Sequence, residues 1–245
     1  MDYNSYLAIE KNYSRDISND FLMPAELRKM FDAGAIDVIA DENALLLLEK
    51  REGFAKLHFR VTRADNMVIR PNELTAAFLT YRVGKTPEAA AEWLIGQGFD
   101  KAKLLRRYTA LEITGDITEE GVDRATADEA YSMLREHFNA VEVDMPCREL
   151  FEGALCVRSS GGVLIGILYM GRTLCLAVSE EARGQGVGRR LYRAYAAVKA
   201  REAKKPRFHE WVAPENAASI AMFQGLGFKA DDIYSACYVS GKQAE

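Results

Sequence analysis

The chain has 245 residues, of which 49% are apolar and 28% are charged, and its formal net charge is −4. This length accommodates one large domain or two small ones, and this composition is typical of a globular protein rather than a disordered or fibrous one. The acidic balance excludes a global basic field, so we expect no nucleic-acid partner, and any phosphate binding must be local. The apolar runs are shorter than the ~20 residues of a membrane helix, and the N-terminal residues lack a signal-peptide pattern. We therefore expect a cytoplasmic protein without a membrane partner.

The cysteines are scattered, with no Cys-x-x-Cys pair and no pair of histidines nearby: Cys147, Cys156, Cys175 and Cys237. This spacing predicts neither a metal site nor a disulfide framework. Cys156 and Cys175 lie in apolar runs, so we expect them in the core.

The first third of the chain contains a helix, a hairpin, a strand and a second helix. A proline in the first turn and a glycine stop predict a helix over residues 23–34. Two apolar runs flank a polar turn at residues 51–53 and predict a β-hairpin, and residues 74–82 are typical of a further strand. The second helix follows Thr86 as its N-cap, has Pro87 at its first position and ends at a glycine.

A polar, glycine-containing segment over residues 112–130 separates this part from a clearer pattern of helices and strands. The elements predicted after it are, in chain order, a helix over 126–138, a short helix over 147–153, strands over 154–159, 162–170 and 173–178, a helix that starts after a glycine run, a strand over 208–213, a helix over 215–228 and a strand over 231–240. We expect Thr126 or Asp128 to cap the first of these helices. This order predicts an α/β fold with a mixed sheet and flanking helices.

A Gly-x-Gly-Phe sequence occurs at residues 96–99 and again, 129 residues later, at 225–228, each time after an alanine-rich helix. The two copies are either parts of a duplicated unit or two independent helix C-caps, each followed by an aromatic strand start. No glycine lies between Gly53 and Gly84, so the N-terminal half has no second glycine-rich anion loop.

The stretch "EARGQGVGRRLY" places three glycines within five residues, directly before a predicted helix. The free N–H groups and the dipole of a helix start attract an anion, and glycines let it approach the backbone. Arg183, Arg189 and Arg190 add positive charge. The glycines alone support a diphosphate cradle and a plain loop equally. Their spacing does not fit a dinucleotide fingerprint, and Gly84-Lys85-Thr86 is only the end of a Walker loop.

Sequence features on both sides of this stretch favour the diphosphate cradle over the plain loop. Arg183, Gly186 and Gly188 fit the pattern Arg/Gln-x-x-Gly-x-Gly/Ala after a strand. Farther on, Asn216 stands at a helix start, Phe223 follows seven residues later, and a Gly-Phe pair comes next. In this register the chain resembles the GCN5-related N-acetyltransferase (GNAT) superfamily over residues 124–239.

The resemblance implies transfer of an acetyl or other short acyl group from acetyl-CoA to a primary amine, with no metal. It implies that the CoA diphosphate lies on the backbone amides of residues 184–189. It also implies that the pantetheine arm pairs like an added strand with the backbone of residues 176–178, where two parallel strands splay apart. Asn216 would bond the pantetheine or a neighbouring loop. The cofactor-binding residues expected on this basis are Leu176, Ala177, Val178, Arg183, Gly184, Gln185, Gly186, Val187, Gly188, Arg189, Asn216 and Phe223.

An amine nucleophile must lose a proton, so a base is expected near the acyl carbon. His209 and Glu210 are neighbours on a predicted strand, and at most one of them faces the cleft because side chains alternate between faces. We expect Glu210 to be the catalytic base, since the flanking Phe208 and Val212 would raise its pKa. The alternative is a solvent-exposed strand residue.

Phe223 departs from the family pattern, in which a tyrosine at this position often protonates the departing CoA thiolate. Phenylalanine keeps the packing and lacks the acid. A thiolate leaves unprotonated at modest cost, because a thiol has a pKa of about 8.5. Tyr234, Tyr238 and Ser219 are the alternative proton donors.

We therefore expect a catalytic GNAT domain at residues 120–245 and a degenerate GNAT-like or accessory half at residues 1–115. The expected function is N-acetyl transfer, with acetyl-CoA and an amine acceptor as partners. A homodimer is compatible with this expectation. The alternative function is a non-catalytic CoA-binding or ligand-sensing protein. A tandem-fold aminoacyl or peptidyl transferase is disfavoured, because its tRNA-linked donor suits a basic surface.

Overall fold

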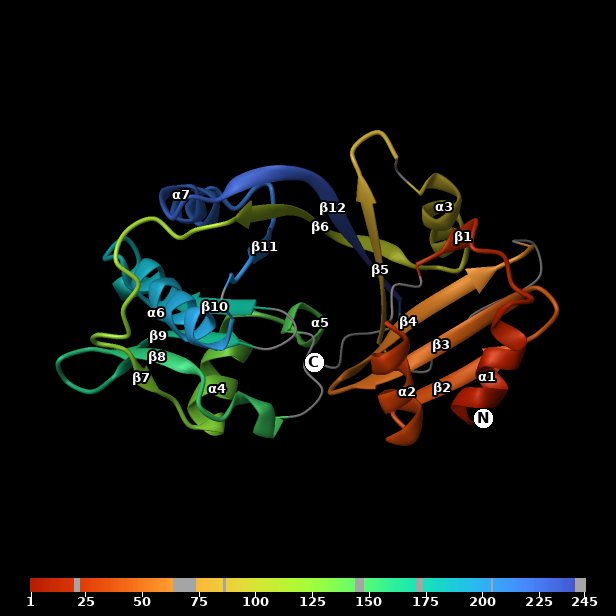
Figure 1. Cartoon of the computed structure of the whole chain (residues 1–245), viewed down its shortest axis with the longest axis horizontal. Coiled ribbons are helices and arrows are strands. Elements are labelled where there is room, and N and C mark those ends of the chain that lie inside the picture. The colour runs from red at the N-terminus through yellow and green to blue at the C-terminus, as the bar shows by residue number, and fades with distance from the viewer. Residues whose placement is uncertain are drawn as a thin grey trace. The chain divides into compact units, whose positions relative to one another are not determined.

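The computed structural model describes residues 1–19, 23–63, 74–85, 87–143, 148–170, 174–203 and 205–240. The chain divides into two compact units, which are called here the N-terminal unit (Met1–Leu105 with Asp232–Glu245) and the C-terminal unit (Arg106–Asp231). Both units contain helices and strands, and the mixed α/β fold expected from the sequence is confirmed (Figure 1).

The elements of the N-terminal unit are α1 (Tyr3–Glu10), β1 (Ile17–Ser18), α2 (Pro24–Asp32), β2 (Ile36–Ala40), β3 (Ala44–Arg51), β4 (Phe54–Val61), β5 (Thr75–Arg82), α3 (Glu88–Gly96), the first part of β6 (Asp100–Ala110) and most of β12 (Lys229–Ser240). Its sheet has the strand order β12-β5-β4-β3-β2. The predicted hairpin is confirmed: β3 and β4 are antiparallel, and Gly53 in the turn has φ +80°, a conformation that glycine adopts without strain.

Helices cover both faces of this sheet, which explains why four consecutive leucines occur in β3. Leu45 and Leu47 pack with Tyr6 of α1 and Leu27 of α2. On the other face, Leu46 packs in a cluster with α3. A strand that is covered on both sides carries apolar residues without alternation.

The elements of the C-terminal unit are the end of β6 (Asp100–Ala110), β7 (Asp123–Arg124), α4 (Ala127–His137), α5 (Ala140–Val143), β8 (Leu155–Arg158), β9 (Leu164–Met170), β10 (Leu174–Val178), α6 (Val187–Glu202), β11 (Phe208–Val212) and α7 (Ala217–Gly225). Its four-stranded sheet has the order β10-β9-β8-β7. Helix α4 packs on one face of this sheet and α6 on the other. Thr126 caps α4 in a capping box with Glu129, so of the two predicted caps Thr126 is the one used.

Two strands are exchanged between the halves of the sequence. β6 follows α3, yet its residues Arg106–Ala110 pair with β11 inside the C-terminal unit. β12 follows α7, yet its residues Ile233–Ser240 pair with β5 inside the N-terminal unit. Helices α3 and α7 begin 129 residues apart, at 88 and 217, and so do β6 and β12, at 100 and 229. The helix–strand order α3–β6 thus occurs again as α7–β12 at the spacing of the two Gly-x-Gly-Phe sequences, and each unit is completed by a strand from the other half.

Several elements differ from the sequence-based expectations. Helix α1 and strands β2 and β6 were not predicted, and Pro87 occupies the N-cap position of α3 rather than its first turn. The expected cap Thr86 and Cys147 lie outside the described residues. The assignment of domains to residues 1–115 and 120–245 stays a prediction, since the compact units divide the chain within β6 and β12.

Candidate functional site

The glycine-rich stretch forms the start of α6. Gly184 and Gly186 have φ of +77° and +78°, in the left-handed region, and Gly186 is the N-cap residue of the helix. The first intrahelical hydrogen bond runs from Arg190 N to Gly186 O (3.0 Å), so the N–H groups of Val187, Gly188 and Arg189 have no acceptor within the helix. These donors lie at the positive end of a 16-residue helix, which makes the stretch suited to an anion.

The third glycine has a different role. Gly188 lies in the first turn of α6, and a Cβ built on it would lie 3.0 Å from Met222 Sδ and 3.4 Å from Leu176 Cδ2. Gly188 therefore lets α6 pack closely against α7 and β10. The three glycines divide into two that shape the backbone and one that permits close packing.

Two further residues of the expected cradle have local partners. The backbone N–H of Gln185 donates to Ala182 O (3.3 Å), and its side-chain amide donates to Glu181 O (2.7 Å). Arg183 is exposed at the end of a short 3₁₀ turn, Glu180–Ala182. Of the expected range 184–189, the amide of Gln185 thus belongs to the turn, and the amides at the helix start are the available anion donors.

Strand β10 ends its sheet and has one open edge. Ser179 N donates to Ile165 O on β9 (3.0 Å). Hydrogen-bonded and non-hydrogen-bonded pairs alternate along an antiparallel ladder, so the N–H and C=O groups of Leu176 and Val178 point away from β9. This edge carries backbone groups suited to an extended ligand, and Ala177, whose backbone faces β9, lies between them.

The second motif builds α7. The Asn216 side chain accepts a hydrogen bond from Ser219 N (3.0 Å) and caps the helix, and its amide NH₂ remains a donor. Phe223 is buried, with its ring 5.3 Å from that of Tyr192 at a right angle and 5.1 Å from that of Phe228. The expected packing role of Phe223 is therefore present.

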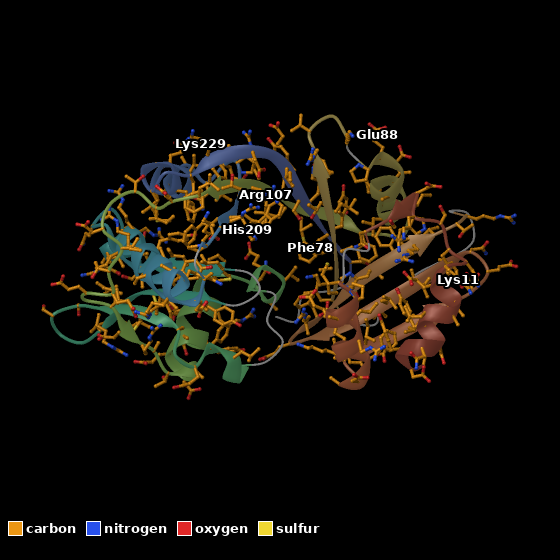
Figure 2. All side chains as sticks on the ribbon, viewed as in Figure 1. Lys11, Phe78, Glu88, Arg107, His209 and Lys229 are labelled. Atoms are coloured by element: carbon orange, nitrogen blue, oxygen red, sulfur yellow. The ribbon has the colours of Figure 1, made fainter. Side chains whose placement is uncertain are left out.

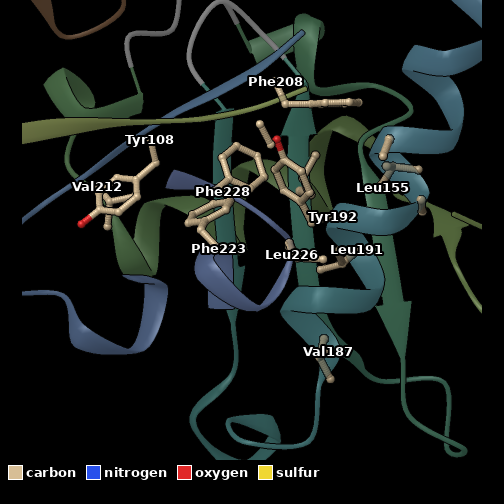
Figure 3. Packing of buried hydrophobic residues seen from close by; sticks show 14 of the residues in the cluster. Tyr108, Leu155, Val187, Leu191, Tyr192, Phe208, Val212, Phe223, Leu226 and Phe228 are labelled. Atoms are coloured by element: carbon tan, nitrogen blue, oxygen red, sulfur yellow. The ribbon is translucent and has the colours of Figure 1, made fainter. Parts of the chain in front are cut away.

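Glu210 lies among aromatic side chains and not on an open surface. Phe208, Glu210 and Val212 share the buried face of β11, as the alternation predicts, and Glu210 is 6% exposed. The Tyr192 hydroxyl donates to Glu210 Oε1 (2.5 Å). Burial raises the pKa of Glu210 to about 8, against the opposing effect of this hydrogen bond. Figure 3 shows the Tyr192 ring between Phe208 and Phe223 in the buried cluster of this unit.

The opposite face of β11 is more open. His209 is exposed and Trp211 is half-buried, and their neighbours across the β6 ladder are Thr109 and Arg107. Arg107 forms an ion pair with Asp231 (2.6 Å). His209 and Arg107 are labelled in Figure 2. The two candidate bases on this strand thus point to opposite faces, as expected.

A cavity of about 540 Å³ opens beside the start of α6. Its lining residues are Thr118, Glu120, Gly121, Gly186, Arg189, Arg190 and Arg193. The sequence reasoning found Gly186 and the first two arginines, but it missed Arg193 and the residues of the loop between β6 and β7. Helical spacing could have placed Arg193 on the face of Gly186, Arg189 and Arg190, whereas no local signal brings residues 118–121 to this helix.

In the N-terminal unit, β4 takes the position that β10 has in the C-terminal unit, because the strand–helix pair β5–α3 follows it as β11–α7 follows β10. β4 and β5 are parallel and pair only over residues 55–57 and 75–77. Beyond this point the edge of β4 is filled by β1 and by Asn19, which is 3% exposed. Asn19 makes three hydrogen bonds to β4: its Nδ2 donates to Leu57 O (2.8 Å), its Oδ1 accepts from Phe59 N (2.7 Å), and its N donates to Phe59 O (3.2 Å).

The structure thus brings together part of the expected site. The helix start, the open edge of β10 and the Met222 side chain meet around Gly188, whereas Glu210 ends in the aromatic cluster and Asn216 caps a helix. Among the described residues, no group of three or more His, Cys, Asp or Glu side chains is placed to hold a metal ion, and no helix is long and apolar enough to cross a membrane.

Comparison with known proteins identifies similar sequences and folds. The sequence model of the acetyltransferase (GNAT) family matches residues 128–228. No curated protein sequence matches the chain significantly. Among solved structures, a Drosophila protein is similar with a TM-score of 0.60 and 15% identity, over 80% of this chain and 74% of that one. A GCN5-related N-acetyltransferase from Kribbella flavida is similar with a TM-score of 0.52 and 14% identity, over 86% and 91% of the two chains.

A tandem GNAT protein from the clavulanic acid biosynthesis pathway is similar with a TM-score of 0.51 and 13% identity, over 91% of this chain and 90% of that one. At these identities the likeness concerns the fold. It extends over both units of the chain.

Proposed function

We propose that this protein moves an acetyl or other short acyl group from acyl-CoA to a primary amine, because residues 128–228 match the sequence model of the GNAT acetyltransferase family. The family supports acyl-CoA-dependent acetyl transfer in general. The primary amine as acceptor and the roles of individual residues go beyond what the family match supports, and they are our proposal.

The observation that carries the proposal is the position of two backbone features in one unit. The free N–H groups at the start of α6 and the open edge of β10 meet at Gly188, where α6 approaches Leu176. CoA combines a diphosphate with an amide-containing arm. The helix start is suited to the diphosphate, and the outward N–H and C=O groups of Leu176 and Val178 are suited to the amides.

In the proposed reaction, the amine nitrogen attacks the thioester carbonyl, a C–N bond forms, and the C–S bond breaks to release CoA as its thiolate. An N–H group at the β10 edge is placed to stabilise the oxyanion that forms between these steps. The amine loses one proton, and the thiolate gains one from solvent or from a side chain. Positioning and backbone dipoles supply most of the rate enhancement in such a site.

Glu210 remains the base of this proposal. A pKa of about 8 would let its carboxyl exchange a proton near neutral pH, and Tyr192 holds it in place. Because Glu210 is 6% exposed and Tyr192 is fully buried, the proton would reach the carboxyl through a small opening of the aromatic cluster. His209, on the open face of the same strand, is the second candidate base.

A second candidate function, CoA binding without turnover, is favoured by Phe223. This side chain is buried between Tyr192 and Phe228 and offers no proton to a thiolate. Tyr234 and Tyr238 belong to the N-terminal unit, where Tyr234 stacks on Tyr81 and Tyr238 lies in the core with α3. The Ser219 backbone contacts Asn216 at the start of α7.

One assay separates the two functions. The release of free CoA thiol from acetyl-CoA is followed over a panel of polyamines, amino acids, aminoglycosides and peptides, beside calorimetric titration with acetyl-CoA. The acyltransferase proposal expects micromolar to millimolar binding and turnover with at least one amine. Binding without turnover on any amine would favour the sensor, and the absence of binding would overturn both.

A further inference from the structure

We propose that the cavity beside the start of α6 binds the 3′-phosphate on the ribose of CoA, so that the protein distinguishes CoA from 3′-dephospho-CoA. The inference rests on the proposed function, because it assigns one further group of the same cosubstrate to residues of this chain. It names Arg190 and Arg193 as residues that determine which acyl donor binds.

The position of the cavity is the first argument. It shares Gly186 and Arg189 with the proposed diphosphate cradle and continues along α6 to Arg190 and Arg193. These four positions lie on one face of the helix, and the last lies about 10 Å along the axis from the first. A ligand whose diphosphate sits on the amides at the helix start therefore places its next group in the cavity.

The charge of the lining is the second argument. Three arginines face a single glutamate, Glu120. Within the part of the chain that the structure describes, none of these arginines forms an ion pair with a carboxylate; Arg193 donates to the backbone O of Thr114 (3.3 Å). Guanidinium groups match the oxygen geometry of a phosphate, and the Thr118 hydroxyl adds a donor. Glu120 is an acceptor and is suited to an N–H of a base instead.

The loop between β6 and β7 is shaped to lie against these arginines. Gly115 has φ +87°, and a Cβ built on it would collide with the end of the Arg193 guanidinium. Gly121 has φ +68°, and its Cβ would lie 3.3 Å from an NH group of Arg190. At both positions glycine lets the backbone approach a guanidinium, and an ion pair between Glu119 and Arg201 fixes the loop to α6. The cavity therefore has two defined walls and is more than a helix terminus.

The chemistry of the ligand is the third argument. Beyond its diphosphate, CoA carries one further anionic group on the nucleoside side, the monoester phosphate of the ribose. A volume of about 540 Å³ lies within the range of small-molecule sites and leaves room for a ribose phosphate with its base. A ligand that ended at the diphosphate would leave Arg190 and Arg193 without an anion.

The experiment compares the dissociation constants of CoA and 3′-dephospho-CoA, measured by calorimetry on the full chain, and needs no amine acceptor. We expect the wild type to bind CoA about tenfold to a hundredfold more tightly than 3′-dephospho-CoA, because the latter lacks the phosphate that accepts charge-assisted hydrogen bonds. Arg190→Gln should reduce the ratio of the two dissociation constants several-fold. The affinity for CoA should fall, while the affinity for 3′-dephospho-CoA changes little. Arg193→Gln should act in the same direction.

Arg135→Gln is the matched control, because Arg135 is an exposed arginine of α4 in the same unit and outside the cavity. The ratio of the two dissociation constants in this variant should equal that of the wild type. Equal binding of both ligands by the wild type would overturn the inference and leave the acyltransferase proposal intact. A ratio that persists in both cavity variants, or that falls equally in Arg135→Gln, would also overturn it. No binding of either ligand would overturn the proposed function itself.

Discussion

Glu210 has a carboxyl group that is nearly excluded from water and meets one donor, the Tyr192 hydroxyl. Burial raises its pKa from the ordinary value of 4.5 to about 8. The folded protein therefore keeps a proton on Glu210 that the unfolded chain releases between these two pH values. Whatever its part in the reaction, this residue makes the free energy of unfolding depend on pH.

The sign of that dependence is a prediction. Between pH 4.5 and 8 the folded state binds the extra proton, so the free energy of unfolding of the wild type should fall as the pH rises through this range. Glu210→Gln lacks the titrating group, so its stability relative to the wild type should increase from pH 5 to pH 9, by about 1.4 kcal/mol for each unit by which the pKa is shifted. Urea unfolding at several pH values measures the difference. A constant difference would show that the Glu210 pKa is not raised.

Gly186 combines a left-handed backbone conformation with a position in the proposed anion site. Its left-handed φ of +78° costs a residue with a Cβ roughly 1–2 kcal/mol, although no atom lies within 4 Å of the built Cβ. Gly186→Ala should therefore shift the helix start and weaken acetyl-CoA binding at least tenfold, while Gly186→Glu should abolish it.

Gly153 provides the control for this prediction. It has a φ of +78° and an equally open Cβ position, and it lies in the same unit but away from α6. Gly153→Ala should lower the melting temperature by a similar amount and leave the affinity for acetyl-CoA unchanged. If both variants bind like the wild type, the start of α6 does not hold the diphosphate.

At the scale of the element, β1 is a segment of two residues that, with Asn19, completes the edge of β4. Asn19 supplies through its side chain the hydrogen bonds that β5 no longer makes beyond Leu57. The edge that is open in β10 is thus occupied in β4 by the chain itself. We infer from this that the N-terminal unit has no room for a second pantetheine arm and that one acyl-CoA binds per chain.

The contribution of Asn19 is measurable. Asn19→Ala removes two buried hydrogen bonds and leaves Leu57 O and Phe59 N without that partner, which should cost about 2–4 kcal/mol of stability. Asn4→Ala, at an exposed position of α1, is the control and should change stability by less than about 0.5 kcal/mol. Chemical denaturation gives both values, and calorimetry should give one acetyl-CoA per chain in each variant. A second bound acetyl-CoA in the wild type would contradict the occupied edge.

The sequence predicted the elements whose signals are local. The cap at Thr126, the turn at Gly53 and the glycine-rich start of α6 each follow from a few neighbouring residues. The missed features depend on partners far along the chain. β6 has a half-exposed pattern with no clear alternation, and its partner β11 lies about 100 residues away.

The candidate site divides in the same way. The helix start was predictable because its glycines form a contiguous motif, and the place of Glu210 on one face with Phe208 and Val212 followed from strand alternation. Its contact with Tyr192 depends on how α6 crosses β11, and the cavity depends on where the loop after β6 returns to α6. The spacing of residues in the sequence predicts neither the crossing of α6 over β11 nor the position of this loop.

At the scale of the whole molecule, the exchanged strands make each unit depend on both halves of the sequence. The C-terminal unit uses Arg106–Ala110 of β6 as the partner of β11, and the loop after β6 lines the cavity. A fragment that begins at residue 120 lacks this strand and the first part of the loop, including Thr118. The region of the family match, 128–228, is thus shorter than the region that folds as one unit.

Two fragments test this dependence. A fragment of residues 106–231 contains the complete C-terminal unit and should unfold in a single cooperative transition. A fragment of residues 120–231 exposes the edge of β11 and should be aggregated or lack a cooperative transition when followed by circular dichroism. Equal thermal stability of the two fragments would show that β6 is dispensable for this unit.

The exchange also sets an order of events on the ribosome. Residues Ile233–Ser240, which pair with β5, are synthesised after the whole C-terminal unit, although β5 belongs to the unit that emerges first. Until β12 has been synthesised, β5 presents an unpaired edge that other nascent chains are able to extend. A product truncated after residue 231 would carry a complete C-terminal unit joined to an unfinished N-terminal one. We therefore expect the solubility of the nascent chain to depend on the synthesis of β12.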